Sequence, residues 1–204
     1  HYAVLARAVD VVVRTAMRLF HLELELESDV RGHPTRSTRR PAIVAARHAG
    51  PGDSFLLVHG LLHRSARRPR IVLKDTLQLD PFIDVLLNRL PSRFVHPRPG
   101  GGDEVTDAIG QLATGMGPND ALVIFPEGGN YTPRRHRRAV DRLRAGGRAP
   151  LADQAEQLRF TLPPRPAGIA AAMAAAPEAR VILVGHTGVD HMVTLRDVWR
   201  GLPE

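Results

Sequence analysis

The most constraining stretch of the sequence is an apolar run that ends at a histidine and is followed by a turn and a second apolar run. The first run covers residues 41–46 and leads to His48, and the second covers residues 55–58. Between them lie residues 50–52, Gly-Pro-Gly, in which Pro presets φ for a turn and Gly accepts a positive φ. The pattern predicts a buried strand, a tight turn and a helix with Asp53 as its N-cap.

His48 and Asp53 are five positions apart, which matters for how their side chains meet. On one continuous helix, residues five apart point about 140° away from each other. A bend at residues 50–52 removes this obstacle. A carboxylate that holds one imidazole nitrogen leaves the other nitrogen to act as a general base. The spacing therefore predicts a catalytic His48–Asp53 pair, with the alternative that Asp53 only caps its helix and His48 only ends its strand.

Another apolar run, residues 122–125, is predicted to form a strand and ends in the turn Pro126-Glu127-Gly128. Acidic residues at such strand ends commonly serve a site. Further strands are predicted at residues 70–73, 94–95 and 181–184, and segments with helical spacing separate the strands. This alternation predicts an α/β fold, a mostly parallel mixed sheet flanked by helices.

Ligands of open α/β sheets bind at the carboxyl ends of the strands. Four candidate residues follow predicted strands, which favours a single site: His48, Lys74, Arg98 and Glu127.

The motif His48-Ala49-Gly50-Pro51-Gly52-Asp53, followed by Phe125-Pro126-Glu127-Gly128, resembles the phospholipid and glycerol acyltransferase superfamily. Its founding members acylate glycerol 3-phosphate and 1-acylglycerol 3-phosphate. Weaker similarities to other family blocks lie at residues 72–77, 93–98 and 180–185. The resemblance thus extends over most of the chain, and we expect a catalytic core at residues 40–190 within a single acyltransferase domain, residues 1–204.

The resemblance implies a glycerol-3-phosphate acyltransferase-like fold and assigns roles to single residues. Arg98 would hold an acceptor phosphate, Lys74 would assist with anionic groups, and the Glu127-Gly128 turn would shape the acceptor pocket. The family often has Thr-Arg after Pro-Glu-Gly, where this sequence has Gly-Asn. The substrate-binding residues it implies are therefore Lys74, Arg98, Glu127, Gly128, and Arg134 or Arg135 in place of the family's arginine.

The function that follows is transfer of a fatty acyl group from acyl-CoA or acyl carrier protein to the hydroxyl of a lysophospholipid or related glycerolipid. His48 would be the general base and Asp53 would orient it, with no acyl-enzyme, no cofactor and no metal. One alternative is a module without catalysis that binds an anionic surface or nucleic acid, although aromatic residues for base stacking make up only 4%. A second alternative is a metal hydrolase built on residues 186–191.

Composition adds bounds on partners and compartment. The formal net charge of +7 favours an anionic partner, and nucleic acid is not expected. The absence of Cys excludes disulfides and thiolate chemistry and fits a reducing compartment. The first residue is His1 rather than Met, so we expect this sequence to be part of a longer chain.

Residues 1–22 show helical spacing, with Leu5, Val9 and Val13 on one side and arginines on another. This amphipathic helix either lies on an anionic membrane or packs on the sheet. The first reading, without any apolar run of eighteen residues, predicts a peripheral protein on the cytoplasmic face of a membrane. Residues 22–27 alternate Leu and Glu and predict a strand, residues 31–40 a basic loop, and residues 134–167 a basic, irregular excursion.

Overall fold

The computed structural model describes residues 1–25, 27, 40–79, 81–95, 102–188, 197 and 200. Within them, one sheet of five strands has the order β3-β2-β4-β1-β5, and each neighbouring pair is parallel. The predicted α/β fold is confirmed, and the described sheet is parallel throughout rather than mixed. Its strands are β1 (Ala42–Ala46), β2 (Arg68–Lys74), β3 (Ser92–Val95), β4 (Asp120–Ile124) and β5 (Arg180–Val184).

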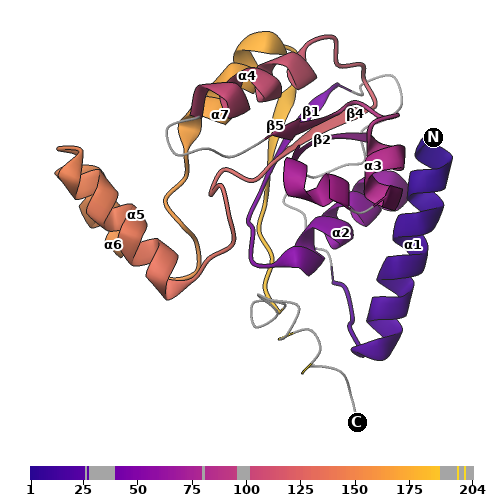
Figure 1. Ribbon diagram of the computed structural model, residues 1–204, viewed down its shortest axis with the longest axis horizontal. Helices are drawn as coiled ribbons and strands as arrows, with labels where there is room; N and C mark the ends of the chain where they lie inside the picture. Colours follow the sequence, from indigo (N-terminus) through magenta and orange to yellow (C-terminus); the bar gives the residue numbers. More distant parts are fainter. Residues whose placement is uncertain are drawn as a thin grey trace.

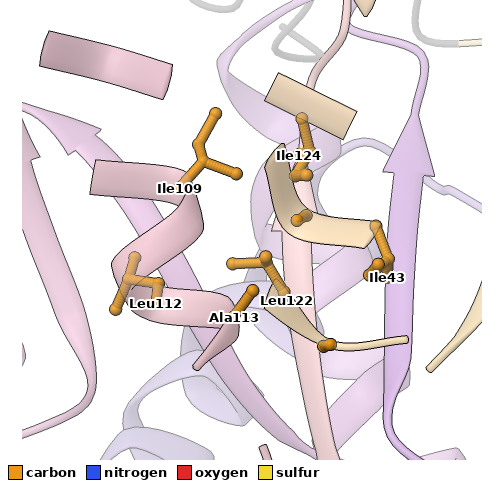
Figure 2. Packing of buried hydrophobic residues seen from close by; sticks show 8 residues of the cluster. Ile43, Ile109, Leu112, Ala113, Leu122 and Ile124 are labelled. Carbon is orange, nitrogen blue, oxygen red and sulfur yellow. The ribbon is translucent and has the colours of Figure 1, made fainter. Parts of the chain in front are cut away.

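The central strands are buried on both faces, which explains their continuous apolar runs. On one face lie α4 (Gly102–Ala113) and α7 (Pro166–Ala175), as Figure 1 shows. Figure 2 shows Ile43, Leu122 and Ile124 of the sheet packed with residues of α4. These two helices approach closely at Gly168 of α7, where an added Cβ would lie only 2.7 Å from Cδ1 of Ile109 in α4.

The other face is covered by α1 (Tyr2–Leu19), α2 (Pro51–His59) and α3 (Pro81–Leu87) (Figure 1). A five-residue π-helix, η2 (Gly60–Arg64), continues α2, and a 3-10 helix, η3 (Asp75–Leu79), follows β2. Leu61 of η2 is buried against β1 and β4. Helix α2 thus lies directly on the sheet and carries the predicted catalytic aspartate at its start.

The apolar stripe of α1 is a packing face. Leu5, Val9 and Val13 are buried in one cluster with Val58 of α2 and Leu87 of α3. The prediction of an amphipathic helix is confirmed, but the interpretation that this stripe faces a membrane is wrong, since Val13 is 1% exposed.

The predicted strand at residues 22–27 is not formed in the part that the structure describes, residues 22–25 and 27. Burial still alternates there, with the two leucines half-buried and the glutamates exposed. An alternating pattern predicts one buried side, but a strand also needs a neighbouring strand, and no described strand pairs with these residues. The predicted basic loop falls on residues that are not described, apart from Arg40.

The segment predicted as an irregular excursion is mostly helical. It forms α5 (Pro133–Ala145) and α6 (Ala149–Glu156), which pack on each other through Val140, Ala152 and Ala155. In Figure 1 this pair lies apart from the helices that cover the sheet. The prediction of irregular structure was wrong because two helices can pack on each other through only a few apolar residues. In the sequence of α5 these apolar residues lie among many arginines, so the helical pattern was not recognised.

Candidate active site

The chain between β1 and α2 forms a helix start rather than a separate turn. Gly50 is the N-cap, and Pro51 takes the first helical position, where its missing N–H costs no hydrogen bond. Asp53 is therefore the third residue of α2 and not its N-cap, which corrects the prediction. Its Oδ2 accepts hydrogen bonds from the N–H groups of Ala49 at 2.6 Å and Gly50 at 3.1 Å, as in a capping box.

His48 and Asp53 form the predicted pair. Nδ1 of His48 lies 3.1 Å from each carboxylate oxygen of Asp53. The hydroxyl of Ser54 donates to Oδ1 of the same carboxylate at 3.2 Å, and the His48 ring rests on Phe125 with ring centroids 4.5 Å apart. Because the carboxylate engages Nδ1, the basic lone pair is on Nε2, and the side chain of His48 is 24% exposed.

The Asp53 carboxylate is buried, yet it stays charged. Burial raises the pKa of Asp53, but hydrogen bonds from His186, His48 and the N–H of Gly50 outweigh burial and hold this pKa well below its usual range. A charged carboxylate here stabilises a proton on the neighbouring imidazole, which is what a general base requires once it has taken a proton.

His186 is a second imidazole at the same carboxylate. It follows β5, the neighbour of β1, and its Nε2 lies 3.5 Å from Oδ2 of Asp53 and 3.3 Å from the carbonyl oxygen of Arg47. The hydrogen bond to Asp53 raises the pKa of His186, against the opposing effect of burial. Sequence reading considered His186 only as part of a metal site at residues 186–191, of which residues 189–191 are not described.

Arg47 joins three segments around this site. Its Nη1 donates to the carbonyl oxygen of His186 at 2.6 Å, and its Nε and Nη2 donate to that of Phe160 at 3.1 and 2.9 Å. The side chain of Arg47, the residue before His48, thus holds the end of β5 and the segment before α7 against β1. Sequence reading did not assign this role.

Glu127 is predicted to line the acceptor pocket, and the structure shows what its oxygens contact. The residue is 6% exposed; Oε1 accepts from the backbone N–H of His48 at 3.0 Å, and Oε2 from that of Leu162 at 2.7 Å. Glu127 therefore fixes the backbone of His48. A contact between Glu127 and substrate stays a prediction.

Gly128 needs its glycine. Its φ is +67°, and a Cβ there would lie 3.2 Å from the guanidinium group of Arg165. The backbone N–H of Arg165 also donates to the carbonyl oxygen of Pro126 at 2.8 Å. Arg165, which sequence reading did not single out, thus covers the Pro-Glu-Gly turn.

Arg134 and Arg135 are exposed in the first turn of α5. The chain just before them is tied to the site, because the N–H of Tyr131 donates to the carbonyl oxygen of His48 at 3.2 Å. Arg135 donates to the backbone and side-chain oxygens of Asn130. Both cations therefore lie in the first turn of a helix that starts close to His48.

The remaining predicted residues are Lys74 and Arg98. Lys74 is exposed at the carboxyl end of β2. Strand β4 lies between β2 and β1, so the backbone of Lys74 is about 10 Å from β1 across the sheet. Arg98 lies outside the described residues. The structure thus brings His48, Asp53, Glu127 and Gly128 together at one sheet edge and leaves Lys74 at its margin.

The fold and the site define a class of protein: a parallel α/β domain in which an inner strand, β1, leads to a histidine that contacts a buried aspartate at the start of the next helix. The sequence model of one family, described as Acyltransferase, matches residues 27–184. The chain belongs to this family, as the resemblance predicted, and the family implies an acyl donor and a lipid acceptor as substrates. Neither the curated proteins nor the solved structures include a match to the chain.

Family membership supports a general acyltransferase activity and disfavours a module without catalysis. Each helix in the described part of the chain is too short or too polar to cross a membrane.

Proposed function

We propose that this protein is an O-acyltransferase that moves a fatty acyl group from acyl-CoA or acyl carrier protein to the hydroxyl of a lysophospholipid or related glycerolipid. The observation that carries the proposal is the contact between Nδ1 of His48 and both oxygens of Asp53 at 3.1 Å. This contact fixes the tautomer that leaves Nε2 free to accept a proton.

In the proposed reaction, Nε2 of His48 takes the proton of the acceptor hydroxyl as its oxygen attacks the thioester carbonyl carbon. Asp53 remains ionised and stabilises the imidazolium. The tetrahedral intermediate then collapses to the ester and expels the thiolate, which receives the proton from His48. Such general-base catalysis typically accelerates a reaction by about 10²- to 10⁴-fold. The step needs no acyl-enzyme and no cofactor.

The anionic groups of both substrates require countercharge near this edge. Arg134 and Arg135 are exposed beside the site, and the outward surface of α5 carries further arginines. Guanidinium groups bind phosphate bidentately, which suits an acceptor phosphate or the phosphates of coenzyme A. We assign Arg134 and Arg135 to these phosphates, with Arg98 and Lys74 as further cations for the acceptor headgroup.

A thiol-release assay tests the activity directly. Acyl-CoAs of several chain lengths and acyl carrier protein are offered with a panel of lysophospholipids and with glycerol 3-phosphate, and free thiol is measured with the acylated product. We expect thiol release that depends on the acceptor. Release without any acylated lipid would identify a thioesterase and overturn the proposed transfer.

The protein would reach its lipid acceptor by binding the membrane surface. The apolar stripe of α1 is buried, but its opposite side exposes Val4 and Val11. Arg7, Arg14 and Arg18 lie exposed on the same side at helical spacing. Apolar burial contributes about 25 cal/mol per Å², and each basic residue near an anionic leaflet about 1 kcal/mol. We therefore propose peripheral binding at the cytoplasmic face through this outer side of α1.

Sedimentation with vesicles of increasing anionic lipid content tests this surface. Binding should weaken with salt without vanishing, because salt screens only the charged part. The double substitution Val4→Asp/Val11→Asp should reduce binding, whereas Leu151→Asp/Met173→Asp, on exposed positions of α6 and α7, adds the same charge elsewhere. Equal loss in both double variants would show that charge alone, and not the α1 surface, controls binding.

A further inference from the structure

Two histidines at the end of α2 face α1. His59 is the last residue of α2, His63 lies in η2, and their rings stack with centroids 4.6 Å apart. Nε2 of His59 is 3.0 Å from Oδ1 of Asp10, and Nε2 of His63 is 3.1 Å from the carbonyl oxygen of Ala6. One side-chain ligand atom from each of Asp10, His59 and His63 lies within 4.8 Å of the other two.

The π-helix accounts for this arrangement. Its wider turn is seen in the hydrogen bond from the N–H of Ser65 to the carbonyl oxygen of Gly60, five residues earlier, at 3.1 Å. Leu61 is buried against the sheet, while His63 stays on the side of α1, one turn after His59. Such π-turns are rare and occur frequently at functional sites.

We propose that Asp10, His59 and His63 bind a divalent transition-metal ion of the zinc class and so link α1 to α2. Two imidazoles and one carboxylate are a donor set that suits Zn²⁺, Co²⁺ and Ni²⁺, and two histidines four apart on a helix present both rings to one ion. Ligand atoms around a tetrahedral zinc lie about 3.3 Å apart, from bond lengths near 2.0 Å. His59 and Asp10 already meet this spacing, and rotation of the exposed His63 closes the rest.

Metal binding would require two changes at this cluster, the release of Arg14 from Asp10 and a change of tautomer in each imidazole. Nε of Arg14 lies 2.9 Å from Oδ1 of Asp10, but this side chain is 67% exposed and moves into water at little cost. Each imidazole must bind the ion through Nε2, which moves its proton to Nδ1. Nδ1 of His59 is buried and has no hydrogen-bond partner among the described residues, so this change of tautomer breaks no hydrogen bond at Nδ1.

The ion would serve structure rather than proton transfer. Asp53 lies six residues before His59, about 9 Å along the helix axis. Linking the end of α2 to α1 would hold the helix that carries Asp53 in place. The sequence predicted no metal, because Asp10 lies 49 positions before His59 and no local motif joins them.

Thermal unfolding of the whole chain, freed of metal by a chelator, tests the proposal. Zn²⁺ at about 100 times its Kd should raise the Tm by about 5 to 10 °C. The Tm should keep rising with the logarithm of the zinc concentration, whereas the amount of bound zinc should saturate at one ion per chain. Co²⁺ should give the visible absorption of a tetrahedral site. Mg²⁺ at the same concentration should have no effect, because it prefers oxygen ligands.

The matched variant is His59→Gln/His63→Gln, because glutamine keeps an N–H donor for Asp10 and for the carbonyl of Ala6 but is a poor metal ligand. It should fold and lose the Tm shift, and the control His21→Gln, at an exposed histidine outside the cluster, should keep it. No shift in the wild-type protein, or a full shift in the double variant, would overturn the proposal. Zinc bound at the other histidines would produce the second result.

Discussion

Helix α2 has one aspartate and two histidines at each of its ends, and the two groups differ in their surroundings. At its start, the Asp53 side chain is 3% exposed, accepts two backbone N–H groups and contacts His48 and His186. At its end, the Asp10 side chain is 22% exposed, and it contacts His59 and the exposed Arg14. The two groups contain the same residue types, but Asp53 is more buried than Asp10 and, unlike Asp10, is described with hydrogen bonds from backbone N–H groups.

The two groups also differ in which imidazole nitrogens face the carboxylate, and this orientation determines which chemistry each group can perform. His48 directs Nδ1 to its carboxylate, so the other ring nitrogen is left for a substrate proton. His59 and His63 instead direct both Nε2 atoms toward α1, where these atoms come close enough for one metal ion once each proton has moved to Nδ1. The start of α2 thus suits proton transfer, and its end suits an ion.

The largest expected effect is at His48. His48→Ala should lower kcat by about 10²- to 10⁴-fold with the fold intact, because the general base is lost. Asp53→Asn should cost nearly as much, and the double variant little more, since the two residues act as one unit. Steady-state kinetics of the three variants measures this. Near-normal turnover in folded His48→Ala would place the base elsewhere.

The second effect concerns Glu127. Glu127→Ala leaves the N–H groups of His48 and Leu162 without their partner, at about 1 to 3 kcal/mol for each buried group. Urea unfolding should show a loss of at least about 2 kcal/mol, and kcat should fall because His48 shifts. The control Glu156→Ala removes an exposed partner of Arg144 and should change the free energy of unfolding by less than about 0.5 kcal/mol. Equal losses of unfolding free energy in Glu127→Ala and Glu156→Ala would contradict the role of Glu127 in holding the backbone of His48 and Leu162.

The third effect is a pH dependence at His186. Because its pKa is raised in the folded state, its contact with Asp53 stabilises the fold fully below the unfolded value of about 6.5, and this stability is lost as pH rises through the folded pKa. His186→Gln should therefore cost about 0.2 to 1 kcal/mol at pH 5.5 and less at pH 8.5. Urea unfolding at both values measures this, and a gap that widens with pH would reverse the assignment.

Much of the fold and the central pair could be predicted from sequence, because both depend on local patterns. The apolar runs gave the strands, and five-residue spacing across Gly-Pro-Gly gave His48 with Asp53. The exact helix start could not be read, since Pro51 suits both a turn and a first helical position.

Contacts between distant segments could not be predicted. His186 reaches Asp53 only because β5 lies beside β1, and strand order is not written in any local pattern. One of the two backbone partners of Glu127 is Leu162, 35 residues away in a segment predicted to be irregular. Asp10 meets His59 only through the packing of α1, whose apolar stripe was equally compatible with a membrane.

The smallest expected effect separates the two ends of α2. Without added metal, His59→Gln/His63→Gln should turn over within about two-fold of the wild-type protein, the range of a substitution away from the core. Glutamine keeps the donors to Asp10 and Ala6, and His59 lies about 9 Å along the helix from Asp53. Parallel assays with His48→Ala give the comparison. A loss as deep as that of His48→Ala would mean that both groups form one catalytic unit, because only a shared reaction path makes distant histidines equally necessary.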